Sequence, residues 1–222
     1  MTKMHPWSFS KIKAFEQCPK QFYHDKVLKE FPFTETDAIL YGSAFHKAAE
    51  DFVGADIPLP AKFSWANDAL LSLKNRKGEK LCEIKLGVTE NLEACSFFAK
   101  DVWFRGIADL VIMDGDLAWV VDYKTGKSSK YADKGQLELM ALGLFAKYPQ
   151  LKTVRAGLLF VVCNDLVKDT YEEYNKGKLW EKWVGKFRQM QTAADADVWN
   201  ARPNGLCRHY CPVVECVHNG AN

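Results

Sequence analysis

Three charged side chains, Asp109, Asp122 and Lys124, lie within two mostly apolar runs of this chain of 222 residues. Charged groups are costly to bury unless they are paired or bound to a metal ion. Two carboxylates can hold Mg²⁺ or Mn²⁺, and a lysine beside them can orient or activate a water molecule. The same three residues would also make an ordinary ion pair on a half-exposed sheet face, so on their own they leave both interpretations open.

A predicted β-hairpin brings these charges together. Runs 104–113 and 117–124 flank an Asp-Gly dipeptide at 114–115, which is a strong hairpin signal because such turns need residues that tolerate positive φ. With the turn at those two residues, the two aspartates become diagonal neighbours on one face of the hairpin. The lysine shares that face because side chains alternate with a period of two.

A cysteine-rich tail is the second candidate metal site. Cys207, Cys211 and Cys216 crowd ten residues with little apolar material around them. Soft thiolates at such short spacing suit zinc or an iron–sulfur cluster, and either would need a fourth ligand. The candidates for that ligand are His209, His218 and, far away in the sequence, Cys18.

The composition is that of an ordinary globular protein, 48% hydrophobic and 26% charged, and the length suits one large domain or one domain with an appendage. No apolar run could span a membrane and the N-terminus lacks a signal-peptide core, so we expect a cytoplasmic protein. Seven cysteines in that compartment indicate metal ligation or free thiols rather than disulfides. The net charge of +2 permits nucleic-acid binding without requiring it.

The surrounding pattern alternates helices and strands. Strand segments at 80–88 and 93–98 lead into the hairpin, and the apolar run 154–163 indicates a buried central strand. A hairpin followed by a helix and a buried strand permits parallel pairing through a crossover. Helices are predicted over 8–30 with a break at Pro19, and over 37–53, 64–74, 133–147 and 175–197.

Three further polar residues and two basic loops are candidates for the same site. His46 lies in a predicted helix, although a lone helix histidine is more often a packed or surface residue. Glu83 stands among apolar neighbours in a strand, and Gln136 opens the helix after the hairpin, where it can reach the carboxylates. Loops 74–80 and 127–134 are basic, which fits either solvated turns or phosphate contacts.

Taken in order, these pieces resemble the RecB-like branch of the PD-(D/E)XK nucleases, in the four-cysteine iron–sulfur subgroup that includes CRISPR-associated RecB-like and phage exonucleases. Residues 42–46 are similar to the G-x-x-x-H motif, 106–109 to G-x-x-D and 122–126 to D-x-K-T-G. Gln136 begins the Q-x-x-x-Y motif, and the cysteine-rich tail closes the pattern.

The chain departs from the family pattern at two points. Met140 stands where the tyrosine of Q-x-x-x-Y is usual. The tail has C-x₃-C-x₄-C spacing, whereas the family more often has C-x₂-C-x₅-C, so the middle cysteine is shifted while the total span is unchanged.

The resemblance implies an α/β fold, a restriction-endonuclease-like core with a mixed central sheet flanked by helices. It implies one nuclease domain over 1–222, in which 1–30 and 200–222 are joined at a metal cluster. The implied Mg²⁺ or Mn²⁺ ligands are His46, Asp109, Asp122 and the Tyr123 carbonyl, and the implied catalytic residues are Asp109, Asp122, Lys124 and Gln136, with Glu83 as an additional acid. The implied [4Fe–4S] ligands are Cys18, Cys207, Cys211 and Cys216, with Zn²⁺ on the tail as the local alternative.

The function implied by the resemblance is a metal-dependent DNA exonuclease that prefers single strands or ends. The implied location is the cytoplasm of a bacterial or phage-infected cell. The alternatives are a structure-specific endonuclease and a non-catalytic DNA-binding module that keeps the cluster. Unwinding of duplex DNA would fall to a helicase or recombination partner. The candidate DNA contacts are Arg105, Lys127, Lys130 and Tyr131, with Trp103 as a further candidate for base stacking.

Overall fold

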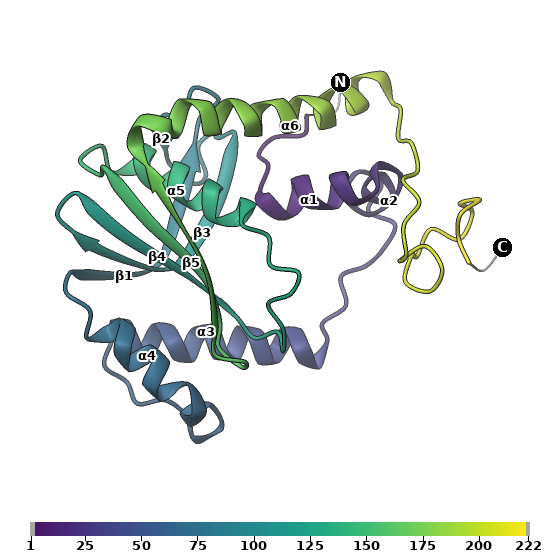
Figure 1. Cartoon of the computed structure of the whole chain (residues 1–222). Coiled ribbons are helices and arrows are strands. Elements are labelled where there is room, and N and C mark those ends of the chain that lie inside the picture. Colours follow the sequence, from purple (N-terminus) through teal and green to yellow (C-terminus); the bar gives the residue numbers. More distant parts are fainter. Residues whose placement is uncertain (1–2, 221–222) are drawn as a thin grey trace. The chain divides into compact units, whose positions relative to one another are not determined.

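The computed structural model describes residues 3–220, and the chain divides into two compact units. The larger unit is Glu35–Glu181, and the smaller unit joins Met1–Thr34 to Lys182–Asn222. Figure 1 shows the larger unit as a twisted sheet with helices on both faces. Among the described residues, no helix has both the length and the apolar character to cross a membrane.

The larger unit contains a six-stranded mixed sheet in the order β2-β1-β3-β4-β5-β6. Only β4 and β5 pair in parallel, and α5 forms the crossover between them, as predicted. A mixed sheet flanked by helices confirms the predicted fold class. The strands are β1 (Glu79–Val88), β2 (Ala94–Cys95), β3 (Phe104–Asp114), β4 (Leu117–Lys124), β5 (Thr153–Phe160) and β6 (Asp165–Glu172).

The hairpin is confirmed, but its register differs from the prediction. Asp114 pairs with Leu117, so the turn is Gly115-Asp116 rather than 114–115. Gly115 alone has positive φ, at 66°, which fits a turn with glycine at its first central position. The pairing ends at Leu110↔Val121, so Asp109 and Asp122 are the first residues beyond the last pair on their two strands.

Each face of the sheet has its own core. Ala108, Val120 and Ala156 pack beneath α5 (Gly135–Lys147), and all three are buried. On the other face, side chains such as Leu110 and Val121 pack against α3 (Asp37–Gly54), α4 (Asn67–Lys74) and the 3₁₀-helix Ala61–Ala66.

The smaller unit begins with two short helices that meet at a proline. α1 (Phe9–Gln17) is capped by Ser8, whose hydroxyl accepts from Lys11 N at 3.3 Å. Pro19 opens α2 (Pro19–Phe22), which leads into a π-helical turn, so the break was correctly predicted. α6 (Lys176–Ala196) spans the boundary between the units. Within the smaller unit, Trp7 stacks on Trp183 and Phe187 of this helix, with ring centroids 6.4 and 5.9 Å apart.

Candidate active site

The site lies at a fork between β3 and β4. β3 stays paired with β1 as far as Phe104, whereas its ladder with β4 ends at Leu110↔Val121. Just beyond the last pair, Tyr123 N donates to Asp109 Oδ2 at 2.7 Å, so a side chain takes the place of a ladder carbonyl. This bond fixes the carboxylate and leaves Asp109 Oδ1 at 3.3 Å from His46 Nδ1.

Three side chains from three elements form a ready-made ligand group. His46 comes from α3, Glu83 from β1 and Asp109 from β3, and one ligand atom of each lies within 4.8 Å of the others. Glu83 has φ 52° and is skipped in the β1–β3 pairing, which turns this position out of the regular strand alternation. Among the described residues this is the only such group, and it makes Glu83 more central than its predicted place as an additional acid.

A second network adjoins this group. Gln136 Nε2 donates to Asp122 Oδ1 at 2.6 Å, and Lys124 Nζ forms an ion pair with Asp122 Oδ2 at 2.6 Å. Lys124 Nζ also donates to Gln136 Oε1 at 3.0 Å, which closes a triangle. Asp122 is only 4% exposed, while Lys124 and Gln136 are half-buried. The predicted reach of Gln136 to the carboxylates is therefore confirmed by geometry.

The carboxylates of the site crowd one another. Burial and the nearby Asp109 charge raise the pKa of Asp122 to about 6, although Lys124 opposes the shift. Burial and Asp109 likewise raise the pKa of Glu83. The pKa of His46 is raised by its hydrogen bond to Asp109, against the effect of burial, and by the charges of Asp122 and Glu83. A site whose groups all favour added positive charge is suited to a cation.

The four cysteines Cys18, Cys207, Cys211 and Cys216 line one small cavity of the smaller unit, and His218 lines it as well. His209 is not among the lining residues. Two sulfurs accept backbone hydrogen bonds at 3.4 Å, Cys18 Sγ from Arg202 N and Cys207 Sγ from Asn204 N. None of the seven cysteines forms a disulfide. The sulfurs are less tightly gathered than the three ligand atoms of the His46 group.

The predicted DNA contacts differ in exposure, since those in the loop after β4 are exposed and the one on β3 is not. Tyr131 is 86% exposed, and Lys130 Nζ lies 5.3 Å from its ring centroid in the loop that follows β4. Lys127 is exposed in the same loop, and Arg105 is half-buried on β3. Trp103 is buried and packs against Trp180 at 5.4 Å, so a stacking role on DNA was the wrong alternative for it.

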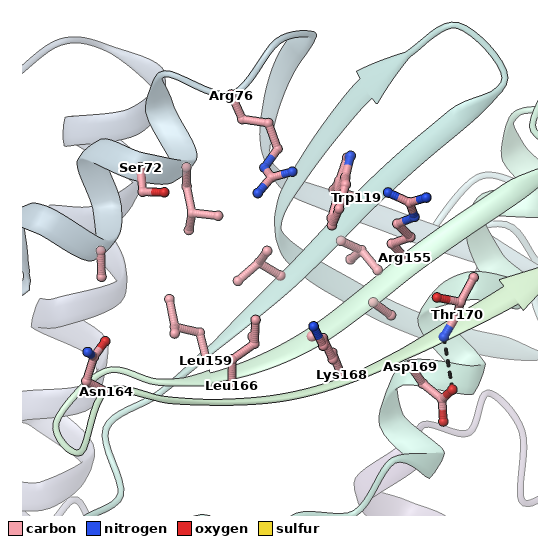
Figure 2. Close-up of a pocket in the computed structure, with 16 residues that line it drawn as sticks. Ser72, Arg76, Trp119, Arg155, Leu159, Asn164, Leu166, Lys168, Asp169 and Thr170 are labelled. Atoms are coloured by element: carbon pink, nitrogen blue, oxygen red, sulfur yellow. Dashed lines mark hydrogen bonds between the residues drawn. The ribbon is translucent and has the colours of Figure 1, made fainter.

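The large cavity of the larger unit, about 770 Å³, contains none of the predicted site residues. It lies between α4 and strands β4–β6 (Figure 2). Trp119 stands between two guanidinium groups there, with Arg76 Cζ 3.9 Å and Arg155 Cζ 4.8 Å from its ring centroid. The predicted site residues thus gather at the β3–β4 fork rather than in this cavity.

The sequence model of the PD-(D/E)XK nuclease superfamily matches residues 6–216. The chain belongs to the PD-(D/E)XK nuclease superfamily. Its members are phosphodiester hydrolases that generally use divalent metal ions, and the His46–Glu83–Asp109 group supplies donors of the required kind. No curated protein matches the sequence.

Two solved structures are similar to this member of the PD-(D/E)XK nuclease superfamily, and the first of them shares its fold. A Eubacterium rectale protein named “Putative exonuclease” superposes with a TM-score of 0.51 at 11% identity, covering 91% of this chain and 86% of its own. The crystal structure of SSO0001 gives a TM-score of 0.48 at 14% identity, over 99% of this chain and 89% of its own.

Proposed function

We propose that this nuclease is a metal-dependent DNA exonuclease of the RecB-like branch that prefers single strands or DNA ends. The observation that carries the proposal is the adjacency of two groups, a His–Glu–Asp ligand set and a buried Asp122–Lys124–Gln136 triangle. Phosphodiester hydrolysis needs stabilisation of negative charge and an oriented water molecule. The ligand set is suited to hold a cation that stabilises the negative charge, and the triangle is suited to orient the water molecule.

The metal ligands of the proposal are His46, Glu83 and Asp109, with Asp122 and the Tyr123 carbonyl as the further predicted oxygen donors. The donors fit because an imidazole with several oxygens suits Mn²⁺ or Mg²⁺. The raised pKa of Asp122, caused by burial and Asp109, also fits, since positive charge would relieve the crowding. When bound, such an ion would neutralise phosphate charge and lower the pKa of a bound water.

Lys124 and Gln136 orient the reacting groups in this proposal. Lys124 Nζ is held by Asp122 and Gln136, and 34% of its side chain remains exposed, so further N–H donors can face a water or a phosphate oxygen. Gln136 uses both ends of its amide within the triangle, which keeps the lysine on one side of the carboxylate. A donor fixed in this way stabilises charge on the phosphate oxygens without reorganising during the reaction.

The test is cleavage of end-labelled DNA, single-stranded and duplex, linear and circular, with Mn²⁺, Mg²⁺ or EDTA. We expect metal-dependent degradation of linear single strands, abolished in Asp122→Ala and Lys124→Ala and retained in Asp116→Asn, a change in the exposed turn of the same hairpin. Cutting of circles would replace the exonuclease with the structure-specific endonuclease. No cleavage by folded, metal-loaded protein would leave the DNA-binding module.

We also propose that Cys18, Cys207, Cys211 and Cys216 hold a [4Fe–4S] cluster that stabilises the smaller unit. The support is their shared cavity and the backbone N–H donors on two of the sulfurs. The protein purified without oxygen should be brown and absorb near ~400 nm, as expected for thiolate-bound iron. Cys18→Ala should lose the colour and Cys163→Ala, an exposed cysteine elsewhere, should keep it. A colourless protein with one zinc would favour the tail site with His218.

A further inference from the structure

Two adjacent phenylalanines stand at the surface of the larger unit, in the loop between β2 and β3. Phe98 is 73% exposed and Phe97 is half-buried. Their ring centroids are 5.1 Å apart and the rings are nearly perpendicular, at 78°. An exposed aromatic pair marks a binding surface more often than a scattered apolar residue does.

Two cations flank these rings. Lys85 Nζ lies 5.9 Å from the Phe97 centroid and 5.6 Å from that of Phe98. Arg105 Cζ lies 5.2 and 5.6 Å from the same two centroids. Neither cation forms an ion pair with a carboxylate in the part of the chain that the structure describes, and the buried Nε of Arg105 lacks a hydrogen-bond partner there. Aromatic faces and unpaired positive charges therefore occupy one patch.

This patch shares a sheet face with the ligand group. Leu86 and Ala108 point into the core beneath α5. Lys85 and Arg105 alternate with them along β1 and β3, so their side chains lie on the opposite face, which is the face of α3 and His46. Lys85 is two residues from Glu83, and a strand rises about 7 Å over two residues.

We propose that Phe97, Phe98, Lys85 and Arg105, here called the Phe97–Phe98 platform, bind single-stranded nucleic acid next to the scissile phosphate. A base stacks on the exposed Phe98 ring, and the two cations contact neighbouring phosphates. Because duplex bases are already stacked on one another, only an unpaired strand offers its base faces, and stacking tolerates any sequence. That the bound nucleic acid is a substrate rests on the proposed function. Its binding to the platform does not depend on that function.

The first experiment measures binding of a fluorescent oligo(dT) to the full chain by anisotropy in EDTA, where cleavage is prevented. Phe98→Ala should weaken binding about 5- to 150-fold, the range expected for loss of one stacked base. Phe98→Trp, which keeps an aromatic ring, should bind oligo(dT) as tightly as the wild type. The affinity for duplex DNA should be the same in wild type and Phe98→Ala. The matched control is Tyr174→Ala, because Tyr174 is 80% exposed in the same unit and has no contact with the platform.

The second experiment removes one base at a time from the oligonucleotide. The wild type should lose affinity when the stacked base is absent, and Phe98→Ala should show no further loss at that position. Lys85→Gln should lower the slope of log K against log salt by about 0.7, the value for one phosphate contact to a single strand.

These measurements separate the platform from the nuclease assignment. Equal oligo(dT) affinity in wild type and Phe98→Ala, or no coupling to any missing base, would overturn the platform even if the wild type cleaves DNA. Coupled binding by a protein that cleaves nothing would keep the platform and remove the exonuclease. Loss of duplex binding in Phe98→Ala, equal to the loss on oligo(dT), would also contradict a stacking role.

Discussion

Asp122→Asn should stabilise the metal-free protein although it destroys the proposed site. Asp122 is 4% exposed, and burial together with the Asp109 charge raises its pKa from 3.8 to about 6. A shift of about 2 units corresponds to roughly 3 kcal/mol between the two protonation states. Asparagine keeps the shape and the acceptor for Gln136 but carries no charge, so it avoids this cost.

The sign of the pH dependence follows from the raised pKa. Between pH 3.8 and about 6 the folded protein holds a proton that the unfolded chain releases, so the stability of the wild type falls as pH rises through this window. At pH 8 the folded protein bears the full free-energy cost of ionising the buried Asp122, and at pH 3.5 this cost is absent because Asp122 is protonated. Since 1 kcal/mol shifts Tm by about 2–4 °C in a domain of this size, we expect Asp122→Asn to raise Tm by roughly 6–12 °C at pH 8.

The assay is thermal unfolding in EDTA at pH 8 and at pH 3.5, with Asp116→Asn as a control in the exposed hairpin turn. The advantage of Asp122→Asn should disappear at pH 3.5, and added Mn²⁺ should stabilise the wild type more than the variant. If Asp122→Asn lowers Tm at pH 8 in EDTA, the contacts of the carboxylate with Lys124 and Gln136 outweigh the cost of burial, and the reasoning is refuted.

Two further predictions concern packing and an ion pair. Gly143→Ala should lower the free energy of unfolding by about 1–3 kcal/mol, because the new Cβ would lie 2.8 Å from Leu86 Cδ1 in a buried contact. The control is Gly185→Ala in α6, whose new Cβ meets nothing within 4 Å and which should stabilise the protein by up to about 1 kcal/mol. Equal effects of the two substitutions in urea unfolding would contradict the clash. Burial opposes ionisation of Glu16, but its contacts with Lys186 and Lys13 lower its pKa, so Glu16→Gln should destabilise modestly at pH 7, by at most about 1 kcal/mol. That difference should shrink as pH falls below 4.5 and through the lowered pKa of Glu16, and a difference that stays constant with pH would exclude the ion pair as its cause.

The sequence predicted the hairpin, the crossover and the convergence of Asp109, Asp122 and Lys124 because these depend on strong local patterns. The predicted register of the hairpin was wrong, and each residue of β3 pairs with a residue of β4 two positions away from the predicted partner. The sequence could not decide this, because Asp-Gly fits a turn at 114–115 as readily as Gly-Asp fits one at 115–116. Both registers place the aspartates near one another, so the error did not hide the site.

Glu83 and β6 show what a local pattern cannot predict. Glu83 has φ 52°, a conformation that glutamate rarely adopts, at the one position of β1 that is left out of the pairing with β3. β6 was not predicted because its sequence is rich in charged residues, which is typical of a loop. It forms a strand by pairing with β5 at the edge of the sheet. The shared cavity of Cys18 and the tail likewise required tertiary structure, although the family resemblance had implied it.

The smaller unit is built from both ends of the described chain, with the sheet unit encoded between them. On the ribosome, Cys18 therefore emerges before the segment Glu35–Glu181, and domains of this size can fold as a unit during synthesis. Its cavity partners Cys207, Cys211 and Cys216 emerge only after that segment has been synthesised. Any cluster that needs all four sulfurs can therefore be assembled only after the whole sheet unit, with its complete His46–Glu83–Asp109 group, has left the ribosome.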